Sequence, residues 1–263
     1  MKAISIMYHD IVEHGGEAFS GFAGVDADLY KVETEQFAEQ LKQISKVVKR
    51  NPDNVLEIEK AINQAQFFIT FDDGGRGAYL QAAALLESYG WCGHFFIATN
   101  FIDTPTFLSA DEIRELNSRG HIIGSHSASH PLRMASLTES EILREWQTSI
   151  EKLADILGYQ VLTASVPGGH FSAKVAETAS QAGIKFLFTS EPTTKIYKVN
   201  EMLVLGRYTI QRQTPTEVIT AIARGDFSPR AKQFLLWNTK KIVKKVSGEN
   251  YLKIRNWMLS KSK

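Results

Sequence analysis

Short runs of apolar residues alternate along this chain with longer stretches in which apolar residues recur at helical spacing. Strands are expected at residues 4–8, 67–71, 92–97, 122–124, 161–166, 186–189 and 203–205. Helices are expected between them, beginning near residues 34, 77, 109, 138, 172 and 214. Because strict alternation of strand and helix implies parallel neighbours and right-handed crossovers, we predict one α/β domain, a closed or nearly closed barrel over residues 1–229.

Helix boundary signals sharpen two of these expectations. Ser109 is followed three residues later by Glu112, and Thr138 by Glu141, so both pairs predict a capping box at a helix start. Gly158 is placed to end the second of these helices. Residues 13–33 and 190–202 show neither the strand pattern nor the helix pattern. They are expected to be longer loops, which can line a site.

The charges of the chain are unevenly distributed. The 30 basic and 29 acidic residues give a net charge of only +1, but residues 230–263 hold ten basic residues against Glu249 alone, a charge of +9. Residues 1–229 therefore carry −8, which makes nucleic acid an improbable partner. The tail at 230–263 is expected to be helical near 230–246 and 251–259, either as a solvated helix packed by its aromatic residues or as a contact for an anionic membrane surface.

Several features bear on the compartment. Cys92 is the single cysteine, so the chain can form no intramolecular disulfide and no zinc site built on cysteines. The first ten residues fall short of a secretory signal, and no apolar run approaches the roughly 20 residues that span a bilayer. We therefore expect a cytoplasmic protein, with peripheral contact at the inner face of the membrane if the tail binds lipid.

The sharpest local motif lies directly after the strand expected at 67–71. Here Asp72 and Asp73 follow one another, and Gly74 and Gly75 come next. The carboxyl ends of barrel strands carry the active sites of such folds, and adjacent carboxylates there repel each other unless a cation or a proton separates their roles. A metal held by one acid while the other acts as base fits this pattern, although a polar turn would also explain it.

A second motif follows the strand expected at 122–124. His126 and His130 lie four residues apart, and in a helical turn that spacing would bring both imidazoles to one ion at about 2.0 to 2.1 Å. Two histidines and one carboxylate make three ligands and leave a position open, as in catalytic rather than structural metal sites. The alternative is a pair of surface histidines in a serine-rich loop.

Together the two motifs resemble those of the polysaccharide deacetylase family, whose NodB-type domain has a TFDDG and an HSxxH motif, matched here at residues 70–74 and 126–130. Residues 8–11 are similar to the family's YHxI opening, and the likeness extends to Arg207. The resemblance implies a distorted barrel of about seven strands. It also implies one divalent metal, usually zinc with cobalt, nickel, manganese or iron as alternatives, held by Asp73, His126 and His130, with Asp72 as the base.

The chain departs from the family pattern at two points. The Arg-x-Pro-x-Gly motif lacks its arginine and reads Ser165-Val166-Pro167-Gly168-Gly169. The backbone N–H of Gly168 would still help to bind the oxyanion, and Arg207 either supplies the missing guanidinium or forms a surface salt bridge. The late histidine that serves as general acid is also missing. His170 is the best substitute and His9 the second, although either could be a structural residue.

The resemblance implies a metal-dependent hydrolase that removes the acetyl group from an N-acetylated amino sugar. Capsule, O-antigen or other exopolysaccharide precursors are the expected substrates, as nucleotide-linked, lipid-linked or growing glycans. A catalytically silent glycan-binding module on the same fold is one alternative. A glycosidase is another, although adjacent carboxylates are poorly placed to flank a glycosidic bond at separations of about 5 to 9.5 Å.

Overall fold

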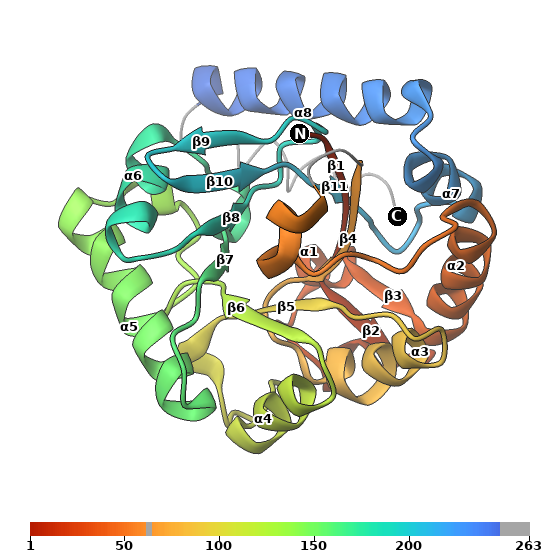
Figure 1. Ribbon diagram of the computed structural model, residues 1–263, viewed down its shortest axis with the longest axis horizontal. Helices are drawn as coiled ribbons and strands as arrows, with labels where there is room; N and C mark the ends of the chain where they lie inside the picture. The colour runs from red at the N-terminus through yellow and green to blue at the C-terminus, as the bar shows by residue number, and fades with distance from the viewer. Residues whose placement is uncertain (62–64, 248–263) are drawn as a thin grey trace.

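A curled sheet of nine strands forms the centre of the molecule (Figure 1). In the computed structural model, which describes residues 1–61 and 65–247, the strand order is β11-β1-β4-β5-β6-β7-β8-β10-β9. The strands are β1 (Ala3–Tyr8), β4 (Gln66–Phe71), β5 (His94–Ile97), β6 (Ile122–Ser125), β7 (Thr163–Ser165), β8 (Phe186–Phe188), β9 (Tyr197–Val199), β10 (Met202–Leu205) and β11 (Tyr208–Thr209). All neighbouring strands are parallel except β10 and β9.

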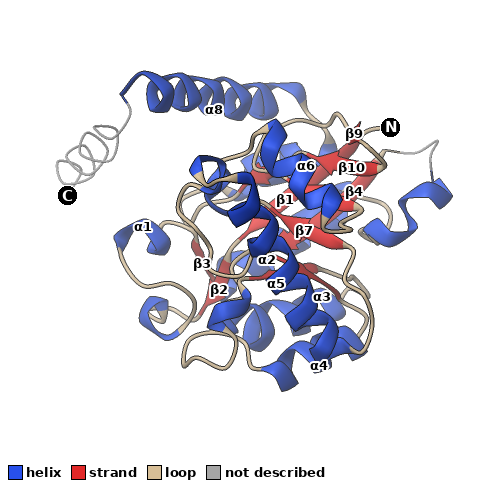
Figure 2. Cartoon of the chain, turned by 90° about the vertical axis from the view of Figure 1, so that its left-hand side faces the viewer, coloured by secondary structure: helices blue, strands red, loops and turns tan. Residues whose placement is uncertain are grey.

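Helices surround this sheet on the outside (Figures 1 and 2). They are α2 (Thr34–Val47), α3 (Ala84–Glu87), α4 (Ala110–Ser118), α5 (Glu139–Leu157), α6 (Ala173–Gln181) and α7 (Thr216–Arg224), with a short α1 (Val25–Asp28) in the segment before α2. The predicted α/β alternation around a curled, barrel-like sheet is therefore confirmed. Both predicted capping boxes are present, at Ser109 of α4 and Thr138 of α5.

Several local expectations were wrong. Each segment expected as a loop contains a short strand, β3 (Lys31–Glu33) in the first and β9 in the second. Strand β3 is parallel to β2 (Asp10–Val12), which was not predicted either, and β9 is antiparallel to its neighbour. Strands of three residues are too short to show a periodicity. The two-residue β11 was also missed, and the helix expected at 77–89 begins with a π-helical segment (Ala78–Ala83) before α3.

The parallel arrangement brings the carboxyl ends of the strands to one edge of the sheet. Strand β1 pairs with β4 so that Tyr8 lies beside Phe71, and the rings of these two residues stack at 5.6 Å. Phe71 stacks in turn on Phe95 of β5 at 4.8 Å. The stacked rings form a rigid, buried layer at the ends of these strands. The residues that directly follow the strands therefore lie together at one end of the barrel.

Helix α8 (Phe227–Ser247) lies along the outer side of the molecule and begins three residues before the expected start of the tail (Figure 2). Gln233 attaches it to the sheet by donating a hydrogen bond to the carbonyl oxygen of Thr209, at 3.1 Å. The second helix expected in the tail, near 251–259, lies outside the described residues. Within residues 1–61 and 65–247, no helix combines the length and apolar character needed to cross a bilayer.

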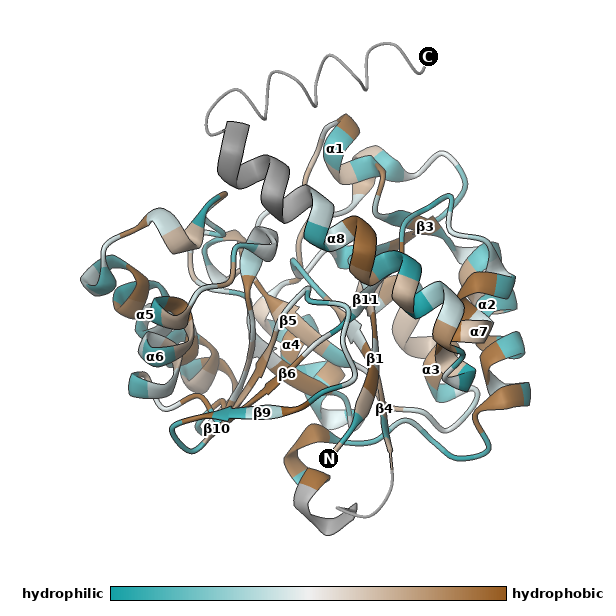
Figure 3. Cartoon of the chain, turned by 90° about the horizontal axis from the view of Figure 1, so that it is seen from above, coloured by the Kyte–Doolittle hydropathy of each residue, from teal (hydrophilic) through white to brown (hydrophobic). Residues whose placement is uncertain are grey.

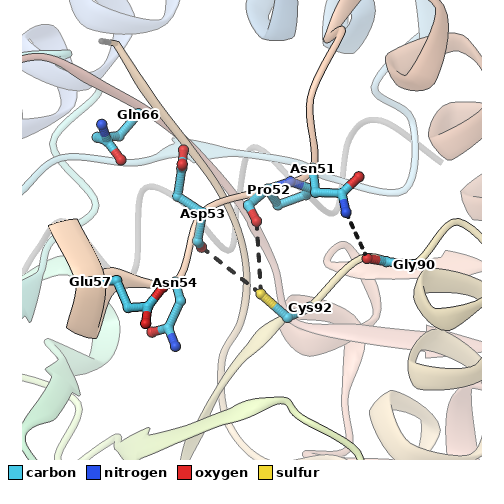
Figure 4. Close-up of a pocket in the computed structure, with 8 residues that line it drawn as sticks. All are labelled: Asn51, Pro52, Asp53, Asn54, Glu57, Gln66, Gly90 and Cys92. Atoms are coloured by element: carbon cyan, nitrogen blue, oxygen red, sulfur yellow. Dashed lines mark hydrogen bonds between the residues drawn. The ribbon is translucent and has the colours of Figure 1, made fainter. Parts of the chain in front are cut away.

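A polar cavity of about 410 Å³ lies at the opposite end of the sheet (Figure 4). It includes Gln66, the first residue of β4, whereas the acid motif follows the last residue of that strand. Six residues of strand separate the two ends by roughly 17 Å. Cys92 lines this cavity, with its Sγ 3.9 Å from the carbonyl oxygen of Pro52. The cavity is therefore distinct from the edge that carries the motifs.

Candidate metal centre

The two acids occupy a tight turn directly after β4. The backbone N–H of Asp72 donates to the carbonyl oxygen of Tyr8 at 3.1 Å, and the N–H of Ala98 donates to that of Asp73 at 3.2 Å. Asp73 has a φ of 75°, in the left-handed region that a residue with a side chain rarely adopts. The surrounding strands hold this strained turn in place, and such strain is often found at functional sites.

The two histidines come from the loop after β6, and the expected helical turn is wrong. Residues 126–130 form a bend in which Ser127 and His130 have φ angles of 64° and 54°. Glu145 of α5 fixes this bend, because its carboxylate accepts hydrogen bonds from the backbone N–H groups of Ala128 and Ser129 at 3.0 and 2.8 Å. The imidazoles thus converge through a clamped loop rather than through helical spacing.

Both imidazoles point at the same carboxylate oxygen. Nε2 of His126 and Nε2 of His130 each lie 3.3 Å from Oδ1 of Asp73, and the three ligand atoms lie within 4.8 Å of one another. Ligand atoms about 2.0 to 2.1 Å from a tetrahedral ion would themselves be about 3.3 Å apart. Oδ1 of Asp73 is buried and has no hydrogen-bond partner among the described residues. The three side chains therefore fit one divalent metal ion.

The electrostatics of the three groups agree with this fit. Burial opposes the ionisation of Asp73, but the neighbouring imidazoles outweigh burial and hold the pKa of its carboxyl well below its usual range. Burial likewise disfavours the charged form of His130, yet Asp73 raises the pKa of this histidine above its ordinary value. The cluster therefore requires a positive charge between its members, which a proton or a metal cation can supply.

Arg207 lies inside the protein and holds the other acid. Its side chain is completely buried and binds Asp72 through two hydrogen bonds, with Nη1 2.6 Å from Oδ1 and Nη2 2.7 Å from Oδ2. A Cβ atom on Gly206 would collide with the carbonyl oxygen of Glu191, so the glycine allows the chain to pass closely here. Burial alone would raise the pKa of Asp72, but the charges of Arg207 and then His126 hold it below its usual range.

The remaining predicted site residues lie at the same end of the barrel. Gly168 has a φ of 62° in the turn after β7, and a Cβ atom there would lie 3.1 Å from the carbonyl oxygen of Leu132, which places the turn beside the histidine loop. His170 ends this turn and is half-buried. His9 follows β1, and the charges of Asp73 and Asp72 reach it although burial lowers its pKa.

The sequence and fold of this chain are similar to those of known proteins. The sequence profile described as "Polysaccharide deacetylase" matches residues 59–187. This segment, just under half of the chain, belongs to the polysaccharide deacetylase family. The peptidoglycan-N-acetylmuramic acid deacetylase PdaA of Bacillus subtilis is 30% identical over 126 residues, which are 47% of this chain and 46% of PdaA. The chain spans about half the length of the curated relatives it matches.

Solved structures of the family share the fold. A polysaccharide deacetylase from Bacillus cereus superposes with a TM-score of 0.70 and 24% identity, covering 85% of this chain and 69% of its own. The deacetylase PplD of Streptococcus pyogenes, solved in complex with acetate, gives a TM-score of 0.68 at 20% identity and covers 82% of this chain and 96% of its own. The resemblance inferred from the two motifs is thus confirmed, together with the fold class.

Two residues of this candidate site were not predicted from the sequence. Ser165 stands where the family's Arg-x-Pro-x-Gly motif has its arginine, and its Oγ lies 3.0 Å from Oδ1 of Asp72. The sequence shows the departure from the motif, but not that the serine found there contacts Asp72. Glu145 gave a weaker signal, as a polar residue next to the buried Trp146 on α5.

Asp10 is a further buried acid, which packs against glycines that follow the acid motif. Its side chain is 4% exposed, and Cβ atoms on Gly75 or Gly77 would collide with its carboxyl oxygens, so these glycines make the close packing possible. Oδ1 accepts the backbone N–H of Ile11 at 3.0 Å, whereas Oδ2 has no hydrogen-bond partner within the described part of the chain. Burial raises the pKa of Asp10 to about 7.

Asp10→Asn is expected to stabilise the protein more at pH 8 than at pH 5. The raised pKa means that the folded state holds a proton that the unfolded state releases, so wild type loses stability as the pH rises toward 7. Asparagine cannot ionise, and the difference in unfolding free energy between variant and wild type should grow by about 3 kcal/mol between pH 5 and pH 8. Urea unfolding at both pH values measures it. Asp111→Asn, at a 93% exposed side chain, is the control, and an Asp10→Asn difference that stays constant would contradict the expectation.

Proposed function

We propose that this deacetylase-family chain hydrolyses the N-acetyl group of an amino sugar in a cell-surface polysaccharide or its precursor. The observation that carries the proposal is that two neighbouring acids have different partners. Asp73 faces two imidazoles in a geometry that fits a metal, while Asp72 is turned toward Arg207. One acid can therefore hold a cation while the other stays ionised and accepts a proton.

The residues of the chain take distinct parts in this hydrolysis. Asp73, His126 and His130 would hold a divalent ion, with zinc as the first candidate given two imidazoles and one carboxylate. When bound, such an ion polarises an acetamide carbonyl and lowers the pKa of water. Asp72 accepts the proton of the attacking water, and the backbone N–H of Gly168 stabilises the oxyanion. The carbon–nitrogen bond then breaks and yields acetate and the sugar amine.

The leaving amine needs a proton, and His9 is better supported than His170 as its donor. His9 leaves β1 beside Asp72, since the register pairs the preceding residues, Tyr8 and Phe71. Its Nδ1 is buried and makes no hydrogen bond to any described residue. The negative charge of Asp72 raises the pKa of His9 and disappears when Asp72 takes up a proton. The pKa of His9 then falls, which favours transfer of its proton to the amine. His170 remains the alternative.

Acetate release tests the proposal. The purified chain is incubated with N-acetylglucosamine oligomers and with N-acetylated peptidoglycan and exopolysaccharide fragments, and acetate is measured as supplied, after EDTA, and after addition of zinc or cobalt. We expect release that EDTA abolishes and the metal restores. Wild type should hold about one divalent ion per chain, and His126→Ala should lose it.

Two outcomes would favour the rival functions. Glycan binding without acetate release from any substrate, in protein loaded with metal, would point to a silent binding module. Cleavage of glycosidic bonds that EDTA leaves unchanged would point to a glycosidase. The geometry disfavours the latter, because Asp72 and Asp73 leave the same turn and Asp72 is engaged by Arg207.

For the partner and location, we propose a lipid-linked or growing glycan at the inner face of the cytoplasmic membrane, with α8 as the membrane contact. The sequence of α8 holds six basic residues and no acidic one. Leu235 and Leu236 are 65% and 53% exposed, and Figure 3 shows apolar and polar residues interspersed along the described part of the helix. Exposed leucines among cations suit an anionic bilayer surface.

Vesicle sedimentation tests this contact. The full chain should pellet with vesicles containing phosphatidylglycerol, and not with neutral phosphatidylcholine vesicles. Leu235→Ser with Leu236→Ser should weaken binding, whereas Leu80→Ser, at a leucine that is 54% exposed on another helix, should not. Equal binding by the double variant, or self-association in place of lipid binding, would count against the membrane contact.

A further inference from the structure

Ser165 connects the proposed base to one of the proposed metal ligands. It is the last residue of β7 and is completely buried. Its Oγ lies 3.0 Å from Oδ1 of Asp72 and 2.6 Å from Nδ1 of His126, and its carbonyl oxygen lies 3.1 Å from the same nitrogen. A single residue thus contacts both halves of the site.

The direction of these hydrogen bonds follows from which groups can donate. A backbone carbonyl only accepts, so the 3.1 Å contact requires a hydrogen on Nδ1 of His126. Asp72 is paired with Arg207 and, when ionised, also only accepts, so the hydroxyl hydrogen of Ser165 must go to Asp72. The oxygen of that hydroxyl is then left to accept the N–H of His126. The chain of donors therefore runs from His126 through Ser165 to Asp72.

This order fixes the form of the histidine. In a neutral imidazole with its hydrogen on Nδ1, Nε2 carries the lone pair, and Nε2 is the atom that faces Asp73 at 3.3 Å. A lone pair and a carboxylate oxygen at that distance repel each other unless a cation lies between them. Partners of this kind commonly orient metal-ligating histidines, and losing one costs about 10- to 100-fold in metal affinity or activity.

We propose that Ser165 is a positioning residue that sets the tautomer of His126 for metal binding and orients the Asp72 carboxylate. The metal-binding part stands on the geometry alone, whereas the part that concerns Asp72 rests on the proposed function. Arg207 and Ser165 then share Oδ1 of Asp72, one as a charged and one as a neutral donor. A hydroxyl on β7 and a guanidinium from the turn after β10 together complete the hydrogen bonding of the base.

Metal affinity is the first test, because it requires no turnover. Ser165→Ala removes the hydroxyl and should weaken zinc binding about 10- to 100-fold in competition with a chromophoric chelator. The matched control is Thr163→Val, two residues earlier on β7. Thr163 is equally buried and donates to the carbonyl oxygen of Ile123, away from the site, so its removal should change zinc affinity less than twofold. Equal affinities for Ser165→Ala and wild type would overturn the proposal.

A spectroscopic readout on wild type keeps the proposal testable if Ser165→Ala fails to fold. In the cobalt-loaded full chain, the ring N–H of His126 should give a hyperfine-shifted proton signal that exchanges slowly with water, because it is buried and donates to Ser165. In Ser165→Ala this exchange should be at least tenfold faster. Absence of a slowly exchanging signal assigned to His126 in wild type would refute the tautomer. Neither measurement depends on acetate release, so a failure of the proposed function would be recognised separately.

Discussion

Asp72→Asn is expected to lower kcat for acetate release by about 10²- to 10⁴-fold while the protein keeps its metal. The substitution preserves the shape of the side chain but removes the carboxylate that we propose accepts the proton of the attacking water. The nearest approach of Asp72 to a ligand imidazole is 3.8 Å, from Oδ2 to Nε2 of His126, and the three-ligand cluster does not include Asp72. Metal content by mass spectrometry and acetate release should therefore change independently.

Asp73→Asn is the matched control, since the two acids are adjacent in the sequence. It should lose both metal and activity, because the oxygen of Asp73 is the one on which both imidazoles converge. If Asp72→Asn lost metal to the same extent, or kept wild-type kcat, the roles assigned to the two acids would have to be exchanged or abandoned.

Arg207→Met is expected to destabilise the fold by about 3 to 5 kcal/mol near neutral pH, because it leaves an unpaired carboxylate in the core. With the guanidinium present, the lowered pKa of Asp72 contributes stability above the ordinary carboxyl pKa, and this contribution is lost as the pH falls through the folded value. Without it, burial dominates and the pKa of Asp72 should rise. The acidic limb of kcat/KM should therefore move to higher pH, and the loss of stability should shrink at low pH.

Denaturant unfolding at several pH values measures this effect, with Arg212→Met as the control. Arg212 also pairs with two carboxylates, Glu17 and Glu33, but it is 32% exposed, so its loss should cost about 1 kcal/mol or less. The double variant Arg207→Met with Asp72→Asn should recover part of the stability because no buried charge remains. Equal losses of unfolding free energy for the two arginine variants would show that the Arg207–Asp72 ion pair contributes no more than an exposed one.

The sequence was sufficient for those parts of the fold that depend on local pattern. The alternation of the longer strands and helices, both capping boxes and the acid turn after β4 follow from neighbouring residues, and all are present. The convergence of His126 and His130 was also expected, but for the wrong reason. Their loop takes its shape from left-handed residues and from Glu145 on α5, and no local spacing reveals such a clamp.

Contacts between distant segments could not be derived in the same way. Arg207 lies 135 residues after Asp72, and whether it becomes buried depends on how β10 and β11 close the sheet. The sequence therefore left its role open between a partner for Asp72 and a surface pair. Ser165 lies 93 residues from Asp72, and the sequence shows only that it replaces an arginine of the motif. A serine by itself does not indicate that its hydroxyl will contact a carboxylate.

The closure of the sheet has a consequence for how this protein can be divided. The recognisable family segment, residues 59–187, includes β4 and most of β8 but omits β1 on one flank and β10 on the other. Expressed alone, it would expose two unpaired strand edges, which tend to associate with other chains, and its acid pair would lack the counter-charge. Truncations designed to preserve solubility should therefore keep every strand of the sheet rather than only the segment that contains the motifs. They should retain at least residues 1–210.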